Sequence, residues 1–124
     1  MVKSEMEKKP IDIRERTFAF SVRVVRICQA LDERAGVPRT LANQLLRSGT
    51  SIGANVEEAH GSQSKADFTA KMYIACKEAR ETHYWLRLLG ATDLLPPEKL
   101  EPITDEANQL VAILTSIVKK SRQP

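Results

Sequence analysis

Residues 41–59 read LANQLLRSGTSIGANVEEA, and apolar or small side chains recur in this stretch at steps of three or four residues. The members of this series are Leu41, Leu45, Ser48, Ile52, Val56 and Ala59. An α-helix has 3.6 residues per turn, so this spacing places all of them on one side of a helix. A strand would instead alternate polar and apolar residues at every second position, and no segment of the chain does so. The stretch therefore predicts an amphipathic helix.

The same rhythm occurs in three further segments of the chain. The first series is Ile13, Thr17, Phe20, Val24, Ile27 and Leu31. The third is Phe68, Met72, Ala75, Ala79, Thr82, Leu86 and Leu89, and the fourth is Leu100, Ile103, Ala107, Leu110, Leu114 and Ile117. Glycine and proline separate the four segments, at Gly36 with Pro38, at Gly61, and at Gly90 with Pro96 and Pro97.

These four segments predict an all-α protein that folds as an antiparallel, up-down-up-down four-helix bundle. The expected helices cover about residues 12–34, 38–60, 65–90 and 97–120, and each is roughly 33–39 Å long. Helices of similar length with short connections pack against their sequential neighbours in antiparallel order. The bundle then occupies residues 12–120, between a flexible N-terminal segment at 1–11 and a tail at 121–124.

Length and composition favour one globular domain. A chain of 124 residues is the usual size of a single domain, and 42% hydrophobic with 28% charged residues is an ordinary globular composition. The first ten residues mix lysine and glutamate and lack the apolar segment of a secretory signal. We therefore expect a cytoplasmic protein with no membrane partner.

One short motif matches a catalytic pattern. Gly49-Thr50-Ser51-Ile52-Gly53 has the G-x-S-x-G form of a hydrolase nucleophile elbow. That chemistry requires a turn from a strand into a helix, which exposes the serine. The residues before Gly49 have helical spacing, so we interpret the two glycines as points where a neighbouring helix approaches closely.

Potential metal ligands are few. The segment from Glu57 to His60 contains one Glu-x-x-His pair, whereas carboxylate-bridged di-iron bundles use two such pairs and two more glutamates. The second histidine, His83, has Arg80 three residues before it. We therefore predict no metal, no cofactor and no enzymatic activity.

Two of the predicted helices carry more apolar residues than one buried face needs. The additional rows are Phe18, Val22 and Val25 in the first helix, and Val111, Ile113 and Val118 in the fourth. Such a surplus suggests burial against another subunit. The alternative is a broad core within a monomer.

A polar series also follows the second helix, at Gln44, Ser48, Ser51, Asn55 and Glu58. If the turn at 61–64 pairs the second and third helices, Arg47 lies opposite Glu78 and Gln44 lies opposite Glu81. This register predicts an ion pair between Arg47 and Glu78 beside the core. Such pairs specify register more reliably than they add stability.

Basic residues are the candidates for contact with nucleic acid. They are Arg16, Arg23 and Arg26, expected on the face opposite the first apolar series, and Lys119 and Lys120 in the basic end of the chain. Repeated cations of this kind bind a phosphate backbone without reading its sequence. Tyr73, Tyr84 and Trp85 are candidates for stacking on bases. The alternatives are a solvated helix face for the cations and core or interface positions for the aromatic residues.

Two longer motifs carry a family resemblance. Residues 44–59, QLLRSGTSIGANVEEA, and residues 77–86, KEARETHYWL, resemble the helix-two and helix-three signatures of a bacterial four-helix-bundle family. That family was first named for proteins encoded in intervening sequences of large-subunit ribosomal RNA genes, and the resemblance covers roughly residues 11–120. The matching positions, to which we assign structural roles, are Gln44, Arg47, Ser48, Ser51, Asn55, Glu58, Glu78, Glu81 and Trp85.

The resemblance implies a four-helix bundle that assembles into a ring-like homopentamer. It also implies kinship with the accessory variability determinant of diversity-generating retroelements, a basic pentamer that partners a reverse transcriptase and binds nucleic acid. The first hypothesis is therefore a non-enzymatic homo-oligomeric accessory protein that binds RNA or DNA through basic helix faces. Its expected partners are further copies of itself, RNA or DNA, and a reverse transcriptase or another protein. The alternative is a structural or protein-interaction oligomer with no nucleic-acid role.

Overall fold

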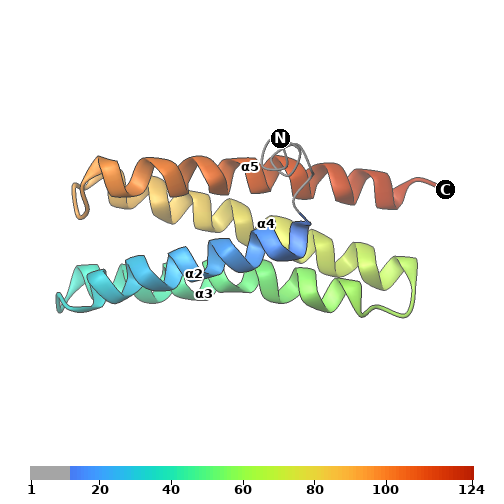
Figure 1. Cartoon of the computed structure of the whole chain (residues 1–124), viewed down its shortest axis with the longest axis horizontal. Coiled ribbons are helices and arrows are strands. Elements are labelled where there is room, and N and C mark those ends of the chain that lie inside the picture. Colours follow the sequence, from blue (N-terminus) through green and yellow to red (C-terminus); the bar gives the residue numbers. More distant parts are fainter. Residues whose placement is uncertain (1–11) are drawn as a thin grey trace, which may run out of the picture.

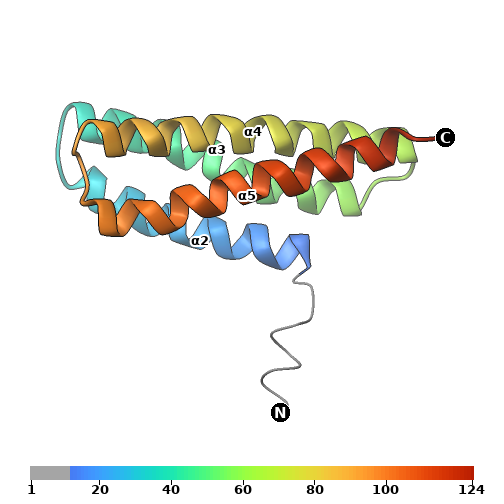
Figure 2. The ribbon, with the colours of Figure 1, turned by 90° about the horizontal axis from the view of Figure 1, so that it is seen from above.

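The computed structural model describes residues 12–124, and this part of the chain contains four helices and no strand. They are α2 (Ile13–Asp32), α3 (Val37–His60), α4 (Lys65–Ala91) and α5 (Pro97–Arg122). Short turns join them, and each helix runs opposite to the one before it (Figures 1 and 2). The prediction of an all-α antiparallel bundle is confirmed. The segment 1–11, predicted to be flexible, lies outside the described residues.

The helix boundaries agree with the predicted ones to within two residues. The α2 helix ends at Asp32, where 34 was expected, and the Arg39 side chain donates to the carbonyl oxygen of Asp32 from Nε at 3.1 Å and Nη2 at 2.9 Å, which satisfies an acceptor at the helix end. The chain then turns at Gly36, whose φ of +92° favours glycine. At the other end α5 continues to Arg122, so the first half of the predicted tail is helical.

The four apolar faces meet in a single core. Ile52 on α3 and Leu86 on α4 are fully buried, as expected from the spacing of their neighbours. The other large side chains that are fully enclosed come from all four helices: Phe20, Val24, Leu31, Leu45, Val56, Met72, Leu89, Ile103, Leu110 and Leu114. No helix within residues 12–124 combines the length and the apolar character needed to cross a membrane.

Five positions of the predicted core series, namely Ile13, Ile27, Leu41, Phe68 and Ile117, are only partly buried and pack against the core from its edge. At three of them the next residue along the chain is buried instead: Cys28, Ala42 and Val118. An α-helix has more than 3.5 residues per turn, so a core-facing stripe needs occasional extra steps of four, and the structure takes them after Val24 and Leu114. Val118 therefore belongs to the core and not to a surplus apolar row.

Two glycines allow α2 and α3 to pack closely. A Cβ atom added to Gly49 would lie 2.7 Å from Cγ1 of Val24, and one added to Gly53 would lie 3.3 Å from the carbonyl oxygen of Thr17. The distance at Gly49 is an overlap, so no larger residue fits there without movement of α2, whereas the distance at Gly53 is a tight contact. The small residues of the motif are confirmed as points of close helix approach.

The fourth side of the bundle, between α2 and α5, is its least packed side. Each helix contacts its sequential neighbour along most of its length, whereas α2 and α5 meet at only a few positions. Figure 2 shows α5 crossing toward α4 as it approaches the C-terminus, away from the start of α2. One ion pair, described below, joins α2 and α5 in this region.

Candidate functional site

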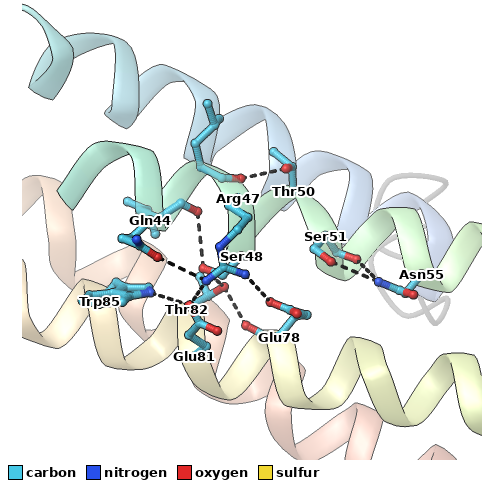
Figure 3. A network of polar contacts seen from close by, with 12 residues as sticks. Gln44, Arg47, Ser48, Thr50, Ser51, Asn55, Glu78, Glu81, Thr82 and Trp85 are labelled. Atoms are coloured by element: carbon cyan, nitrogen blue, oxygen red, sulfur yellow. Dashed lines mark hydrogen bonds and ion pairs between the residues drawn. The ribbon is translucent and has the colours of Figure 1, made fainter. Parts of the chain in front are cut away.

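A polar network lies along the outer edge of the α3–α4 contact (Figure 3). Arg47 on α3 donates from Nη1 to Oε1 of Glu78 on α4 at 3.4 Å, which confirms the predicted ion pair. Its Nη2 also donates to Glu81 and, at 3.3 Å, to Oε1 of Gln44. Gln44 and Glu81 therefore share Arg47 as their common partner. The guanidinium is half exposed, and an ion pair of this kind contributes about 0–1 kcal/mol to stability.

The network continues inward from Glu81. Trp85 donates its indole N–H to Oε2 of Glu81 at 2.9 Å, one turn along the same helix. Deeper between the helices, the hydroxyl oxygens of Ser48 and Thr82 lie 2.9 Å apart, and both residues are fully buried. Buried hydroxyls that satisfy each other avoid the cost of an unpaired polar group. These side chains hold α3 and α4 in one register.

The serine of the G-x-S-x-G pattern lies in the interior of α3 and not at a turn. Ser51 accepts a hydrogen bond at Oγ from Nδ2 of Asn55 at 3.0 Å, one helical turn away. Helix extends on both sides of it, from Val37 to His60. The strand-to-helix turn of a nucleophile elbow is therefore absent at this position. About two turns after Ser51 on α3, Glu58 accepts from Nζ of Lys71 on α4 at 2.9 Å, and this contact raises the pKa of the lysine.

The potential metal ligands are dispersed. Within residues 12–124, no three or more histidine, cysteine or acidic side chains come together in a cluster suited to a metal ion. His60 contacts the carbonyl oxygen of Val56 through Nδ1 at 2.9 Å and packs edge-on against Phe68. His83 lies on α4, where burial, and secondarily the charge of Arg87, lowers its pKa. Among the hydrogen bonds of residues 12–124, none joins a histidine to a serine, threonine or cysteine side chain.

The two cysteines are buried free thiols. Burial, together with the nearby charge of Asp32, raises the pKa of Cys28 to about 11. Because the thiolate is the reactive form, a thiol with this pKa is inert at neutral pH. Cys76 contacts the hydroxyl of Thr115 at 3.3 Å across the α4–α5 interface. Both cysteines therefore act as small core residues.

Arg16 forms the connection between α2 and α5. Its Nε lies 2.7 Å from Oε2 of Glu106, its Nη2 lies 2.9 Å from Oε1 of the same carboxylate, and Nη2 also donates to Gln109 at 2.7 Å. The hydrogen bond with Glu106 raises the pKa of the guanidinium. Arg16 is thus at the side of the bundle, partly buried, and not opposite the apolar face of its helix as expected. Arg16 immediately precedes the buried Thr17, so it lies about 100° of helical rotation from that residue, on the flank of the apolar face that borders α5.

The remaining candidate cations do not form one patch. Arg23 and Arg26 are exposed further along α2, whereas Lys119 and Lys120 lie in the last turns of α5. Because the two helices are antiparallel and Arg16 meets Glu106, Arg23 and Lys119 are separated by about 20 residues of helical rise, or about 30 Å. A single contact with a short ligand cannot include both groups.

A second group of basic side chains, interleaved with two tyrosines, lies on the outer face of α4. Its members follow one another at steps of four and three residues and are all exposed: Tyr73, Lys77, Arg80, Tyr84 and Arg87. Sequence reasoning named the two tyrosines but did not connect them with the cations between them. The signal was available, because these positions repeat the helical period on the side opposite the apolar series.

The comparisons with known proteins agree with this architecture. The family model described as 23S rRNA-intervening sequence protein matches residues 9–116. A solved structure of a protein with unknown function, from the S23 ribosomal protein family of Bacteroides thetaiotaomicron VPI-5482, is 41% identical. The match covers 87% of this chain and 99% of that one, with a TM-score of 0.80. No curated protein matches the chain.

Neither comparison indicates an enzymatic family. The family match extends from before α2 into the last turns of α5, and so includes the α3–α4 polar network and all of the core except Val118. This chain belongs to the family of 23S rRNA-intervening sequence proteins.

Proposed function

We propose that this chain is a non-enzymatic, homo-oligomeric accessory protein, pentameric when assembled, that contacts RNA or DNA through basic helix faces. The subunit number follows from the family resemblance of the two helix motifs. The observation that carries the proposal is an exposed apolar face on the outer side of α2 and α3. An assembly surface and a phosphate-binding surface are together sufficient for a protein that acts by binding.

The apolar face consists of Phe18 and Val25 on α2 and Leu46 on α3. Phe18 exposes 68% of its surface, and Val25 and Leu46 each expose 38%. The three side chains line shallow grooves along the α2–α3 contact, together with small or polar residues such as Thr50 and Ala54. A row of large apolar side chains at this exposure favours burial against another protein surface. In a homo-oligomer the covering surface comes from a second copy of the chain.

The assembly is tested by Phe18→Asp. A charge at this position opposes burial against an apolar partner, while the monomer loses little because the side chain is exposed. We expect the wild-type protein to have the mass of an oligomer in size-exclusion chromatography with light scattering. We expect the variant to have the mass of a monomer and an unchanged helical circular dichroism spectrum.

Val37→Asp is the matched control for that substitution. Val37 is 66% exposed and begins α3, nine residues and therefore about half a turn around the helix from Leu46. Its replacement is expected to leave the oligomer intact. A monomeric wild-type protein, or equal dissociation of both variants, would contradict assembly through the apolar face.

The nucleic-acid part of the proposal is supported by charge. The chain has a net charge of +3 and a pI near 9.0, and assembly multiplies the exposed cations of each subunit. We expect fluorescence anisotropy to detect binding of labelled RNA or DNA that weakens steeply between about 50 mM and about 200 mM salt, because bound cations displace counterions from the phosphates. Binding that does not respond to salt would argue against phosphate contact.

The alternative is an oligomer that has a structural or protein-binding role and no nucleic-acid role. It is favoured by the engagement of Arg16 with Glu106 and by the distance between the α2 and α5 cations. An assembled protein that shows no salt-dependent binding of either nucleic acid would support this alternative.

A further inference from the structure

The outer face of α4 carries an alternating row of aromatic and basic side chains, here called the α4 row: Tyr73, Lys77, Arg80, Tyr84 and Arg87. At about 100° per residue, the steps of four, three, four and three keep these positions within an arc of about 80°. Tyr73 is 42% exposed and Tyr84 is 48% exposed. The row therefore presents two accessible rings on one line of the surface.

Cations lie close to both rings. The ammonium of Lys77 lies 5.7 Å from the ring centre of Tyr73, and the guanidinium of Arg122, which comes from α5, lies 5.3 Å from the same ring. The guanidinium of Arg87 lies 5.9 Å from the ring centre of Tyr84. These are loose surface contacts between long side chains and rings, so the cations can turn toward a phosphate without disturbing the helix.

The cations of the α4 row are not neutralised by carboxylates. None of them takes part in an ion pair among the described residues. The two glutamates of the same helix segment, Glu78 and Glu81, turn instead toward Arg47 on α3. The polar network of the family motif thus engages the two acidic side chains that lie between the cations of the row in sequence.

Aromatic rings interleaved with free cations fit one class of ligand. In single-stranded nucleic acid the bases are free to stack on side-chain rings while the phosphates meet the cations, and this combination binds without sequence preference. In a duplex the base faces are already stacked, so the tyrosines would contribute little. Tyr73 and Tyr84 are 11 residues apart, or about 16 Å along α4. That distance is covered by about five nucleotides of a stacked strand.

We propose that the α4 row binds single-stranded nucleic acid by base stacking on Tyr73 and Tyr84 and by phosphate contact with Lys77, Arg80 and Arg87. This inference rests on the proposed nucleic-acid function and deepens it, because it names the surface and the form of the ligand. It places the contact on α4, and not on the exposed arginines of α2. Phe18, the exposed aromatic residue of α2, is assigned to assembly and not to base stacking.

The test uses the full chain and two labelled probes, a 20-nucleotide single strand of mixed sequence and its duplex, in fluorescence anisotropy at low salt. The paired replacement Tyr73→Ala with Tyr84→Ala is expected to weaken single-strand binding by at least about tenfold. The pair Tyr73→Phe with Tyr84→Phe retains both rings and is expected to bind within about twofold of wild type. Duplex binding is expected to change little in either variant.

The charge of the row is tested separately. Lys77→Gln with Arg80→Gln is expected to weaken single-strand binding and to reduce the slope of log affinity against log salt by about 1.4, since each phosphate contact in a single strand contributes about 0.7. Arg23→Gln with Arg26→Gln removes the same charge from α2 and is the matched control. That control is expected to bind like wild type.

The possible failures are distinguishable. If the α2 control loses binding and the α4 variants retain it, the α4 row is not the site, although the protein still binds nucleic acid. If wild type binds neither probe, the proposed nucleic-acid function fails as well. If the tyrosine-to-alanine variant changes the oligomer mass but not the affinity, the row is a contact between copies of the chain and the inference is overturned.

Discussion

Ile52→Asp is expected to unfold the protein. Ile52 is fully buried in α3, surrounded by the apolar side chains of the core. An aspartate there would bury a charge without a partner, which costs several kcal/mol even when the group lowers this cost by taking up a proton. Domains are stable by only about 5–15 kcal/mol, so the loss is comparable with the whole free energy of unfolding. Circular dichroism at 25 °C should show a large decrease in helix content.

Ile52→Val serves as the control for this substitution. It removes one methylene group from the same site, and the expected loss is about 0.5–1.5 kcal/mol. The valine variant should therefore stay folded with a moderately lower Tm. An aspartate variant that unfolds at the same temperature as wild type would mean that Ile52 is not enclosed, and the assignment of the core face would be wrong.

Gly49→Ala is expected to destabilise the protein although alanine is the better helix former. Alanine in place of a mid-helix glycine normally adds about 1 kcal/mol. Here the new Cβ would lie 2.7 and 2.8 Å from the two γ carbons of Val24, which is itself fully buried and branched at Cβ. Overpacking of this kind costs about 1–3 kcal/mol, and α2 must move away from α3. We expect thermal unfolding to show a Tm that is lower by several degrees.

Gly90→Ala is the matched control in the same fold. Gly90 also lies within a helix, near the end of α4, but a Cβ there would meet nothing closer than Cδ1 of Leu100 at 3.8 Å, an ordinary contact. The helix propensity of alanine then acts alone, and Tm should rise or stay unchanged. Equal stabilisation by both substitutions would show that α2 and α3 do not depend on the close contact at Gly49.

The regular part of this structure was predictable from periodicity. Apolar residues at steps of three and four, interrupted by glycine and proline, predicted all four helices to within two residues at each end. The ion pair between Arg47 and Glu78 was predictable too, because the short turn at 61–64 determines the antiparallel register of α3 and α4. Local connections of this kind leave one simple arrangement of the two helices.

The choice between adjacent apolar residues was not predictable. Ile27 and Cys28 are both apolar, as are Ile117 and Val118, and either member of each pair continues the stripe. The helices cross at an angle, so the face that meets the core moves around each helix axis along its length. Which residue of each pair is buried depends on that crossing angle, and the sequence of one helix does not contain it.

The sequence by itself determined the class of the fold, the order and extent of its helices, most of its core and the contacts between helices that follow one another along the chain. The tertiary structure alone decided where α2 meets α5, and with it the partnership of Arg16 and Glu106 across 90 positions of sequence. The reason is physical: short turns determine the register of sequential helices, whereas the first and last helices are placed by the packing of the two between them. The tertiary structure also decided that two tyrosines lie beside the unpaired cations of α4 and beside Arg122 of α5. It turns the neighbouring acids, Glu78 and Glu81, toward Arg47 on α3.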